Sequence, residues 1–267
     1  MSKLKKIQIG VPCGPNSEHY VKHLIQSSNK TTSDPKRIEF LLAINDKSVD
    51  TDEILTVSTD SEIKIIDAVN DNPISSHGHG LCLDLLFSNM TEDFGMIVDA
   101  DVAFLAKGWD EKMLSLIHDD IVIIGSEYSG SKYLKFPNAI CCLFRVKALQ
   151  MCSNISFTPA KTRQITINST NARVFGRDPG DIIDLDVGWQ LPFKIKIRGG
   201  DGIALPLINS DDERCKFMTA GMRGEEHQIN GEPVFTHVGR SSYRNFHTDP
   251  IILMWRKRVD EWITKNA

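Results

Sequence analysis

Short runs of β-branched and other apolar residues alternate with helical patterns along the first half of the chain. Five such runs predict strands, at residues 7–11, 38–44, 63–66, 95–98 and 121–124. Between them, apolar residues recur at helical spacing, as in the segment that Ser17 can cap and in the leucine-rich segment 80–90. Alternation of this kind predicts an α/β fold, with a mostly parallel central sheet and helices on both of its faces.

The second half of the chain is less regular. Residues 139–144 predict a strand, 146–152 and 184–191 predict short helices, and the polar stretch 153–181 predicts a long loop. The last segment is clearer, because Asp249 can cap a helix whose apolar residues share one face. Since no repeat or linker divides the sequence, we expect a single domain over residues 1–267.

The composition excludes several classes of protein. With 267 residues, 41% of them hydrophobic, the chain can bury a sizeable core. Its net charge of −4 argues against nucleic acid as a partner, because contact with phosphates needs a basic surface. No apolar run approaches the roughly 18 residues of a membrane span. The six cysteines lack regular spacing and predict reduced thiols, so we expect a cytoplasmic protein without a transmembrane segment.

Asp99 and Asp101 form the most informative local motif. They directly follow an apolar strand, and residues 102–105 after them are apolar again. Carboxylates flanked by core need partners, and their oxygens are the ligands that Mg²⁺ and Mn²⁺ prefer. Because ligands of open α/β sheets bind at the carboxyl ends of strands, the position of this pair predicts a metal site.

Several segments follow one another in a characteristic order. VPCGPN, which contains Pro12, ends the first strand, and INDKSVDTDEI ends the second. GHGLCLDLLFSNM then precedes FGMIVDADV. In this order the segments resemble the donor-binding motifs of nucleotide-sugar-dependent glycosyltransferases of the GT-A fold, near the large inverting group. The resemblance implies that Pro12 borders the donor pocket, that Asp46 receives the nucleotide base, and that Asp99 and Asp101 act at the ribose and the metal.

The downstream segment IIDLDVGWQL extends the resemblance to the catalytic base. It is similar to the Glu-Asp-x-Asp-Leu-x-x-Arg stretch of the family, with Ile183 in place of the Glu and Gln190 in place of the Arg. The resemblance therefore implies Asp184 or Asp186 as the base and leaves the choice between them open.

The segment PVFTHVGRSS resembles the late His segment that completes the metal site in many GT-A enzymes. The ligands of Mn²⁺ or Mg²⁺ implied in this way are Asp99, Asp101 and His237. Arg240 and Arg244, just after His237, could bind the donor diphosphate, and a solvated basic turn is the alternative.

The implied reaction transfers a sugar from a nucleotide-diphosphate sugar to a hydroxyl of a carbohydrate or glycoconjugate acceptor, with inversion. A divalent ion would stabilise the charge of the leaving diphosphate, and a carboxylate would accept the proton of the acceptor hydroxyl. Residues 1–125 are expected to bind the nucleotide sugar and residues 126–248 the acceptor, followed by a C-terminal helix over 249–263. The donor sugar, the base and the acceptor are not defined by the sequence.

Other functions compete with this interpretation. A phosphatase of the haloacid dehalogenase type also carries Asp-x-Asp after an apolar strand, but there the motif opens the fold. A sugar-phosphate nucleotidyltransferase would need a Gly-rich N-terminal loop that this chain lacks. A GT-A-like protein that binds nucleotide sugars with weakened catalysis is favoured by Ile183 and Gln190. His77 and His79 are poorly spaced for zinc and are expected to lead into a helix.

Overall fold

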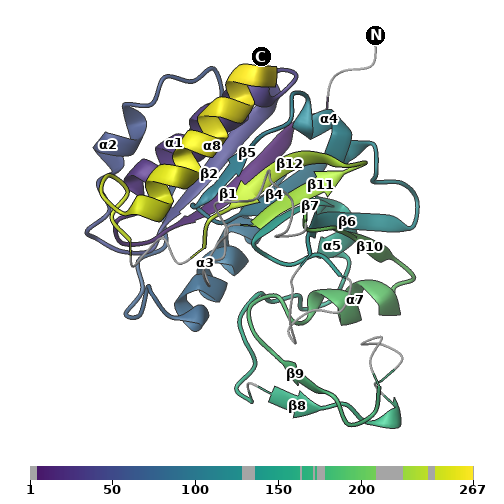
Figure 1. The fold of residues 1–267 in the computed structure, drawn as a ribbon. Helices are drawn as coiled ribbons and strands as arrows, with labels where there is room; N and C mark the ends of the chain where they lie inside the picture. The colour runs from purple at the N-terminus through teal and green to yellow at the C-terminus, as the bar shows by residue number, and fades with distance from the viewer. Residues whose placement is uncertain are drawn as a thin grey trace.

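The computed structural model describes residues 5–127, 136–162, 164–170, 172, 178–208, 225–239 and 244–266. A seven-stranded sheet forms its centre (Figure 1). The spatial order of its strands is β10 (Asp201–Leu205), β6 (Ile121–Ser126), β7 (Cys141–Arg145), β4 (Phe94–Val98), β1 (Ile7–Cys13), β2 (Ile38–Ile44) and β3 (Glu62–Asp67). β7 runs antiparallel to β4 and β6, and the other pairs are parallel, so the sheet is mostly parallel as expected.

Helices cover both faces of this sheet. On one face α1 (Glu18–Thr31), α2 (Thr51–Leu55) and α4 (Trp109–Leu114) share an apolar cluster with β1 and β2. On the other face α3 (Ser76–Ser88), α5 (Val146–Gln150) and α7 (Leu191–Ile197) pack against β2, β4 and β7. A short 3-10 helix, Pro35–Arg37, precedes β2. The expected α/β layering is therefore confirmed.

Two smaller sheets complete the described part of the chain. β11 (Glu225–Ile229), β12 (Glu232–His237) and β5 (Val102–Phe104) form an antiparallel sheet, and β8 (Gln164–Thr166) pairs with β9 (Ile182–Asp184). Because β5 follows β4 after a short turn, β12 ends beside that turn. The final helix α8 (Pro250–Asn266) lies along α1 (Figure 1).

Several local predictions are confirmed. The predicted strands at 7–11, 38–44, 63–66, 95–98, 121–124 and 139–144 correspond to β1, β2, β3, β4, β6 and β7. Asp249 caps α8, because its Oδ1 accepts hydrogen bonds from Ile251 N at 2.9 Å and Ile252 N at 3.3 Å. The five described cysteines are buried free thiols. None of the helices in the described ranges is long and apolar enough to cross a bilayer.

Three predictions need correction. The helix expected at 184–191 is absent, since β9 ends at Asp184 and α7 begins at Leu191. Gly188 between them has a φ of 76°, which interrupts a helix, and Pro192 favours a helix start. The stretch 153–181 contains β8 and is not a loop throughout. Ser17 precedes α1, but its side chain makes no capping hydrogen bond.

Candidate active site

A cavity of about 450 Å³ opens at the carboxyl ends of β1, β2 and β4. β2 and β3 lie on one side of β1 and β4 lies on the other, so the strand order reverses at this point. Such reversals create the crevice in which open α/β sheets bind their ligands. The lining includes Pro12 and residues 14–17 after β1, Asn45 after β2, the start of α3, residues 99–101 after β4, and Asp186, Glu225 and His237.

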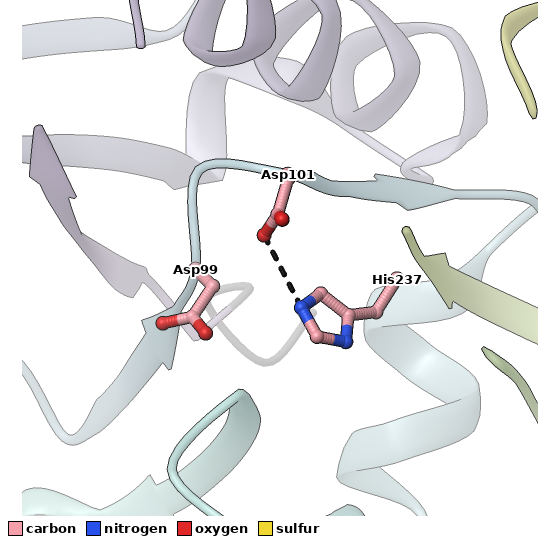
Figure 2. Close-up of side chains that lie close together, drawn as sticks. All are labelled: Asp99, Asp101 and His237. Carbon is pink, nitrogen blue, oxygen red and sulfur yellow. Dashed lines mark ion pairs between the residues drawn. The ribbon is translucent and has the colours of Figure 1, made fainter. Parts of the chain in front are cut away.

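Asp99, Asp101 and His237 come together at this cavity (Figure 2). One ligand atom from each lies within 4.8 Å of the others. Asp101 Oδ1 is 3.2 Å from His237 Nε2, the pair joined by the dashed line in Figure 2. Carboxylate oxygens suit Mn²⁺ and Mg²⁺, and imidazole is a common ligand of transition metals. The donor set therefore fits a divalent cation of this kind.

Backbone hydrogen bonds hold the ends of three strands around this group. Asp99 N donates to Ile140 O at 2.7 Å, and Val102 N donates to Asp99 O at 3.2 Å, which closes the turn between β4 and β5. Val238 N donates to Asp101 O at 3.1 Å and ties the end of β12 to the same turn. The three side chains thus project from backbone that the surrounding strands fix in place.

Glu225 lies behind His237 as seen from the two aspartates. Its Oε2 is 3.4 Å from His237 Nδ1, so the imidazole spans Asp101 and Glu225. Burial opposes the charge on Glu225, but the imidazoles of His227 and His237 lower the pKa of its carboxyl to about 2. Burial likewise opposes a proton on His237, but Asp101 first and then Glu225 raise its pKa well above the usual value. A carboxylate that accepts from Nδ1 leaves Nε2 directed at the metal position, which is the usual arrangement of a metal-binding histidine.

His79 lies in the first turn of α3 and points to the same group of carboxylates. Its Nε2 is 3.3 Å from Asp99 Oδ1. Burial would lower the pKa of His79, but Asp99, then Asp101 and Asp186, raise it. Ser75 begins this helix by accepting a hydrogen bond from Gly78 N at 2.9 Å, so α3 starts earlier than residue 80 and carries His79 into the cavity wall.

The two candidate bases occupy different positions. Asp186 lines the cavity, in the turn between β9 and α7. Asp184 is the last residue of β9, is absent from the cavity lining, and accepts a hydrogen bond from Gln164 Nε2 at 2.7 Å. The charge of Asp186 also contributes to the raised pKa of His79. Of the two, only Asp186 lies where it can meet a ligand in this cavity.

The residues expected to bind the nucleotide sugar also differ in whether they line the cavity. Pro12 lines the cavity, as does Asn45, whereas the neighbouring Asp46 is absent from the lining. Asp46 Oδ1 instead accepts hydrogen bonds from the backbone and hydroxyl of Ser48, which lower the pKa of this carboxyl. Asn45 is nearly fully buried, and its Nδ2 donates to Pro73 O at 3.2 Å.

The basic candidates after His237 are only partly described. Arg240 lies outside the described residues. Arg244 is paired with Asp249 at 3.1 Å, at the start of α8. On α8 itself, Arg258 forms an ion pair with the fully buried Glu226.

Reasoning from sequence missed three groups that line the cavity: Asn45, His79 as a partner of Asp99, and Glu225. Asn45 is the residue directly before the predicted Asp46, at the end of the same strand. His79 stands four residues after the capping Ser75, so a correct helix start would have placed it in the first turn. Glu225 carries no signal, because only the pairing of β11 with β12 brings it to His237.

Comparison with known proteins bears on the fold. No protein-family model and no curated protein sequence matches the chain. Among solved structures, it is similar to the mannosyltransferase PcManGT from Pyrobaculum calidifontis in complex with GDP-Man and Mn²⁺, with a TM-score of 0.53 at 12% identity. That match covers 77% of this chain and 56% of the mannosyltransferase, so the chain spans little more than half of its length.

A second similar structure is S. aureus TarS 1-349, with a TM-score of 0.47 at 13% identity, covering 82% of this chain and 67% of that one. A third is glucosyl-3-phosphoglycerate synthase from Mycobacterium tuberculosis, with a TM-score of 0.40 at 14% identity over 58% of this chain and 60% of that one. The similarity to the mannosyltransferase, together with the sheet order around β1, shows that this chain has the α/β fold of GT-A glycosyltransferases.

Proposed function

We propose that this protein is a metal-dependent glycosyltransferase that moves a sugar from a nucleotide-diphosphate sugar to the hydroxyl of a carbohydrate or glycoconjugate acceptor, with inversion. One observation carries the proposal: Asp99, Asp101 and His237 meet at the strand-order reversal of a GT-A fold. The mannosyltransferase with the similar fold is a complex with GDP-Man and Mn²⁺, which supports a nucleotide sugar and Mn²⁺ or Mg²⁺ here.

The donor would lie in the cavity with its nucleotide toward the ends of β1 and β2, where Pro12 and Asn45 form the wall and Asp46 lies at the edge. Its diphosphate would face Asp99 and Asp101. A divalent cation held by these two residues and His237 would act as a Lewis acid on the leaving diphosphate. His79 and Glu225 would orient Asp99 and His237 through the contacts they already make. Arg240 is proposed as a further diphosphate contact.

Asp186 is the base that the cavity favours. In the transfer, the acceptor oxygen forms a bond to the anomeric carbon while the bond from that carbon to the diphosphate oxygen breaks. The proton of the acceptor hydroxyl passes to the carboxylate, so the base must reach the acceptor inside the cavity. Asp186 meets this requirement, and Asp184 is engaged by Gln164 outside it. The acceptor would enter from the half of the chain after residue 125.

A second candidate is a protein that binds nucleotide sugars but transfers them weakly. Ile183 replaces the acidic residue of the family, and it is buried in the apolar cluster of β9, so no carboxylate replaces it locally. Gln190, in place of the family's Arg, precedes α7. Binding without turnover of any donor would favour this candidate. The phosphatase alternative is not proposed, because the fold is that of GT-A proteins.

Thermal unfolding with nucleoside diphosphates tests the proposal. UDP and GDP are each added with and without Mn²⁺, to the natural protein and to Asp101→Ala. We expect at least one nucleotide to raise Tm only when Mn²⁺ is present, because a ligand that binds the folded state stabilises it. The Asp101→Ala variant should lose this increase. If neither UDP nor GDP changes Tm in any condition, the proposed function is wrong.

A further inference from the structure

We propose that the C-terminal helix α8 fixes the position of His237, and that Arg258 and Thr236 are positioning residues for the metal site. The inference rests on the proposed function, since it concerns the same ligand group. The contacts that support it lie on the back of the β11-β12-β5 sheet, the face turned away from the metal ligands. There the structure connects α8 to the two strands that carry Glu225 and His237.

Adjacent residues of β11 and β12 face opposite sides of the sheet. In the antiparallel register, Glu225 is paired with His237 and Glu226 with Thr236. Side chains alternate along a strand, so the first pair faces one side and the second pair faces the other. The contacts agree with this, because Glu225 lies 3.4 Å from His237 Nδ1. Each metal-side residue is therefore next in sequence to a residue on the back.

Both residues on the back are bound by α8. Arg258 donates from Nε and Nη2 to the two carboxylate oxygens of Glu226, at 2.9 and 3.2 Å. Trp255 Nε1 donates to Thr236 Oγ1 at 3.3 Å. Glu226, Thr236 and Trp255 are all fully buried. Two parallel hydrogen bonds to a carboxylate fix direction as well as distance, and only arginine offers this planar arrangement.

Apolar packing brings α8 to the same sheet. Trp255, Val259 and Ile263 of the helix share a cluster with Ala103 and Leu105. Ala103 is paired with Thr236 across β5 and β12, so it stands on the same back face. β5 follows directly from the turn that carries Asp99 and Asp101. α8 thus holds the strand that bears His237 against the strand that follows the two aspartates.

A buried Glu–Arg pair at this position is informative because buried ion pairs in proteins can often be replaced by apolar residues without loss of stability. The pair fixes the position and orientation of the Glu226 side chain, since Glu226 cannot move along the strand without breaking two hydrogen bonds. Because Glu225 and Glu226 share a peptide unit, a shift of one moves the other. We therefore expect the contacts of α8 with β11 and β12 to determine the position of the His237 imidazole relative to Asp101.

The test uses two substitutions on the back and two controls. Arg258→Lys keeps the positive charge and removes the bidentate contact, and Thr236→Val removes one hydroxyl at nearly constant volume. Lys257→Gln controls for charge on α8, since Lys257 is exposed and pairs only with Glu261 among its described neighbours, at 3.7 Å. Arg37→Lys controls for stability, because it weakens a buried pair with Asp110 at the amino end of β2, opposite the cavity.

Three quantities are measured on the full chain: the Kd for Mn²⁺ by calorimetry, the imidazole ¹⁵N resonances of His237 without metal, and Tm. Both back-face variants should shift the His237 resonances, and Arg258→Lys should raise the Kd for Mn²⁺ about tenfold, a typical effect of residues behind metal ligands. Lys257→Gln should change none of the three. Arg37→Lys should lower Tm while leaving the Kd and the resonances unchanged.

The outcomes separate this inference from the proposed function. If Arg258→Lys lowers Tm as Arg37→Lys does but leaves the Kd and the His237 resonances unchanged, α8 only stabilises the fold and the inference is wrong. If the natural protein binds no Mn²⁺ while the resonances shift in both back-face variants, the coupling stands and the metal-dependent function fails. If there is neither binding nor a shift, both fail.

Discussion

The residues of the cavity fall into two groups. Some would bind the cation directly, and others contact those residues and orient them. Asp99, Asp101 and His237 would supply the ligand atoms of the proposed cation, while His79 and Glu225 each contact one of these residues from outside the group. Asp186, in the turn after β9, lines the same cavity and is a third carboxylate whose charge raises the pKa of His79. The concentration of acidic groups here, within a chain of net charge −4, is what a divalent cation would offset.

Asp186→Asn and Asp184→Asn form a matched pair for the base. Each removes one ionisable carboxylate at constant size, and only Asp186 lines the cavity. We expect Asp186→Asn to lower kcat by about 10²–10⁴-fold, the usual contribution of a general base, and Asp184→Asn to retain most of the activity. Steady-state release of nucleoside diphosphate from the donor, with water as the acceptor, measures both. The opposite ranking would assign the base to Asp184.

The sequence predicted those site residues that lie directly next to an apolar strand. Asp99 and Asp101 were found because carboxylates between buried segments need partners, and His237 was found by resemblance. Glu225 could not be predicted, because its place depends on a strand register that no local pattern encodes. The sequence left Asp184 and Asp186 as alternatives, and it did not predict that the first ends a strand while the second lies in the next turn and lines the cavity.

The strands and helices of the first half could be predicted because each shows a local pattern of apolar residues, either a short run or a helical spacing. β1, β2 and β4 are buried along their full lengths and are almost entirely apolar, with Gln8 and Glu39 as the polar exceptions. The region around β9 was not predictable, since the three residues of that strand are too few for a period. The position of this region depends on α3, because the segment that precedes β9 is hydrogen-bonded to that helix.

Asp84 and Gly80 of α3 make that attachment. Asp84 accepts hydrogen bonds from Phe157 N at 2.6 Å and Ser156 Oγ at 2.7 Å, and Phe157 O accepts from Gly188 N at 2.9 Å. A Cβ on Gly80 would lie 2.6 Å from Thr158 Cα. The chain around Asp186 is therefore held to α3 through a second segment.

Gly80→Ala tests this attachment. The added methyl group would meet backbone, which must move, so we expect a loss of about 1–3 kcal/mol in the free energy of unfolding. Activity measured well below Tm should also fall, because the displaced segment carries Asp186 with it. Leu81→Ala, at an exposed neighbouring position, is the control for both measurements. Full activity in Gly80→Ala would mean that α3 does not position the base.

The whole molecule combines a central sheet, helices on both faces, and an outer layer in which α8 covers α1 and the small sheet. His23 of α1 lies in this outer layer, with its ring 5.1 Å from that of Trp255. Burial, followed by the charges of Arg256 and Lys30, lowers the pKa of His23 to about 4. Its Nε2 has no hydrogen-bond partner among the described residues.

This histidine makes the stability of the whole fold depend on pH. The unfolded chain binds the proton near pH 6.5 and the folded chain only near pH 4, so the unfolded state holds more protons in between. Stability should therefore decrease as the pH falls through this window, by at most about 3 kcal/mol from this group. His23→Phe should reduce the slope of unfolding free energy against pH, while His118→Gln at an exposed position should not. An unchanged slope in His23→Phe would refute the prediction.

Asp99, Asp101 and His237 are proposed to bind a divalent cation together with a nucleoside diphosphate. Anomalous scattering from crystals grown with Mn²⁺ and a nucleoside diphosphate, collected at the manganese edge, tests it most directly. We expect one dominant peak in coordination distance of all three side chains, with the diphosphate beside it and the base toward the ends of β1 and β2. A peak elsewhere, or a bound nucleotide with no manganese at these residues, would contradict the claim.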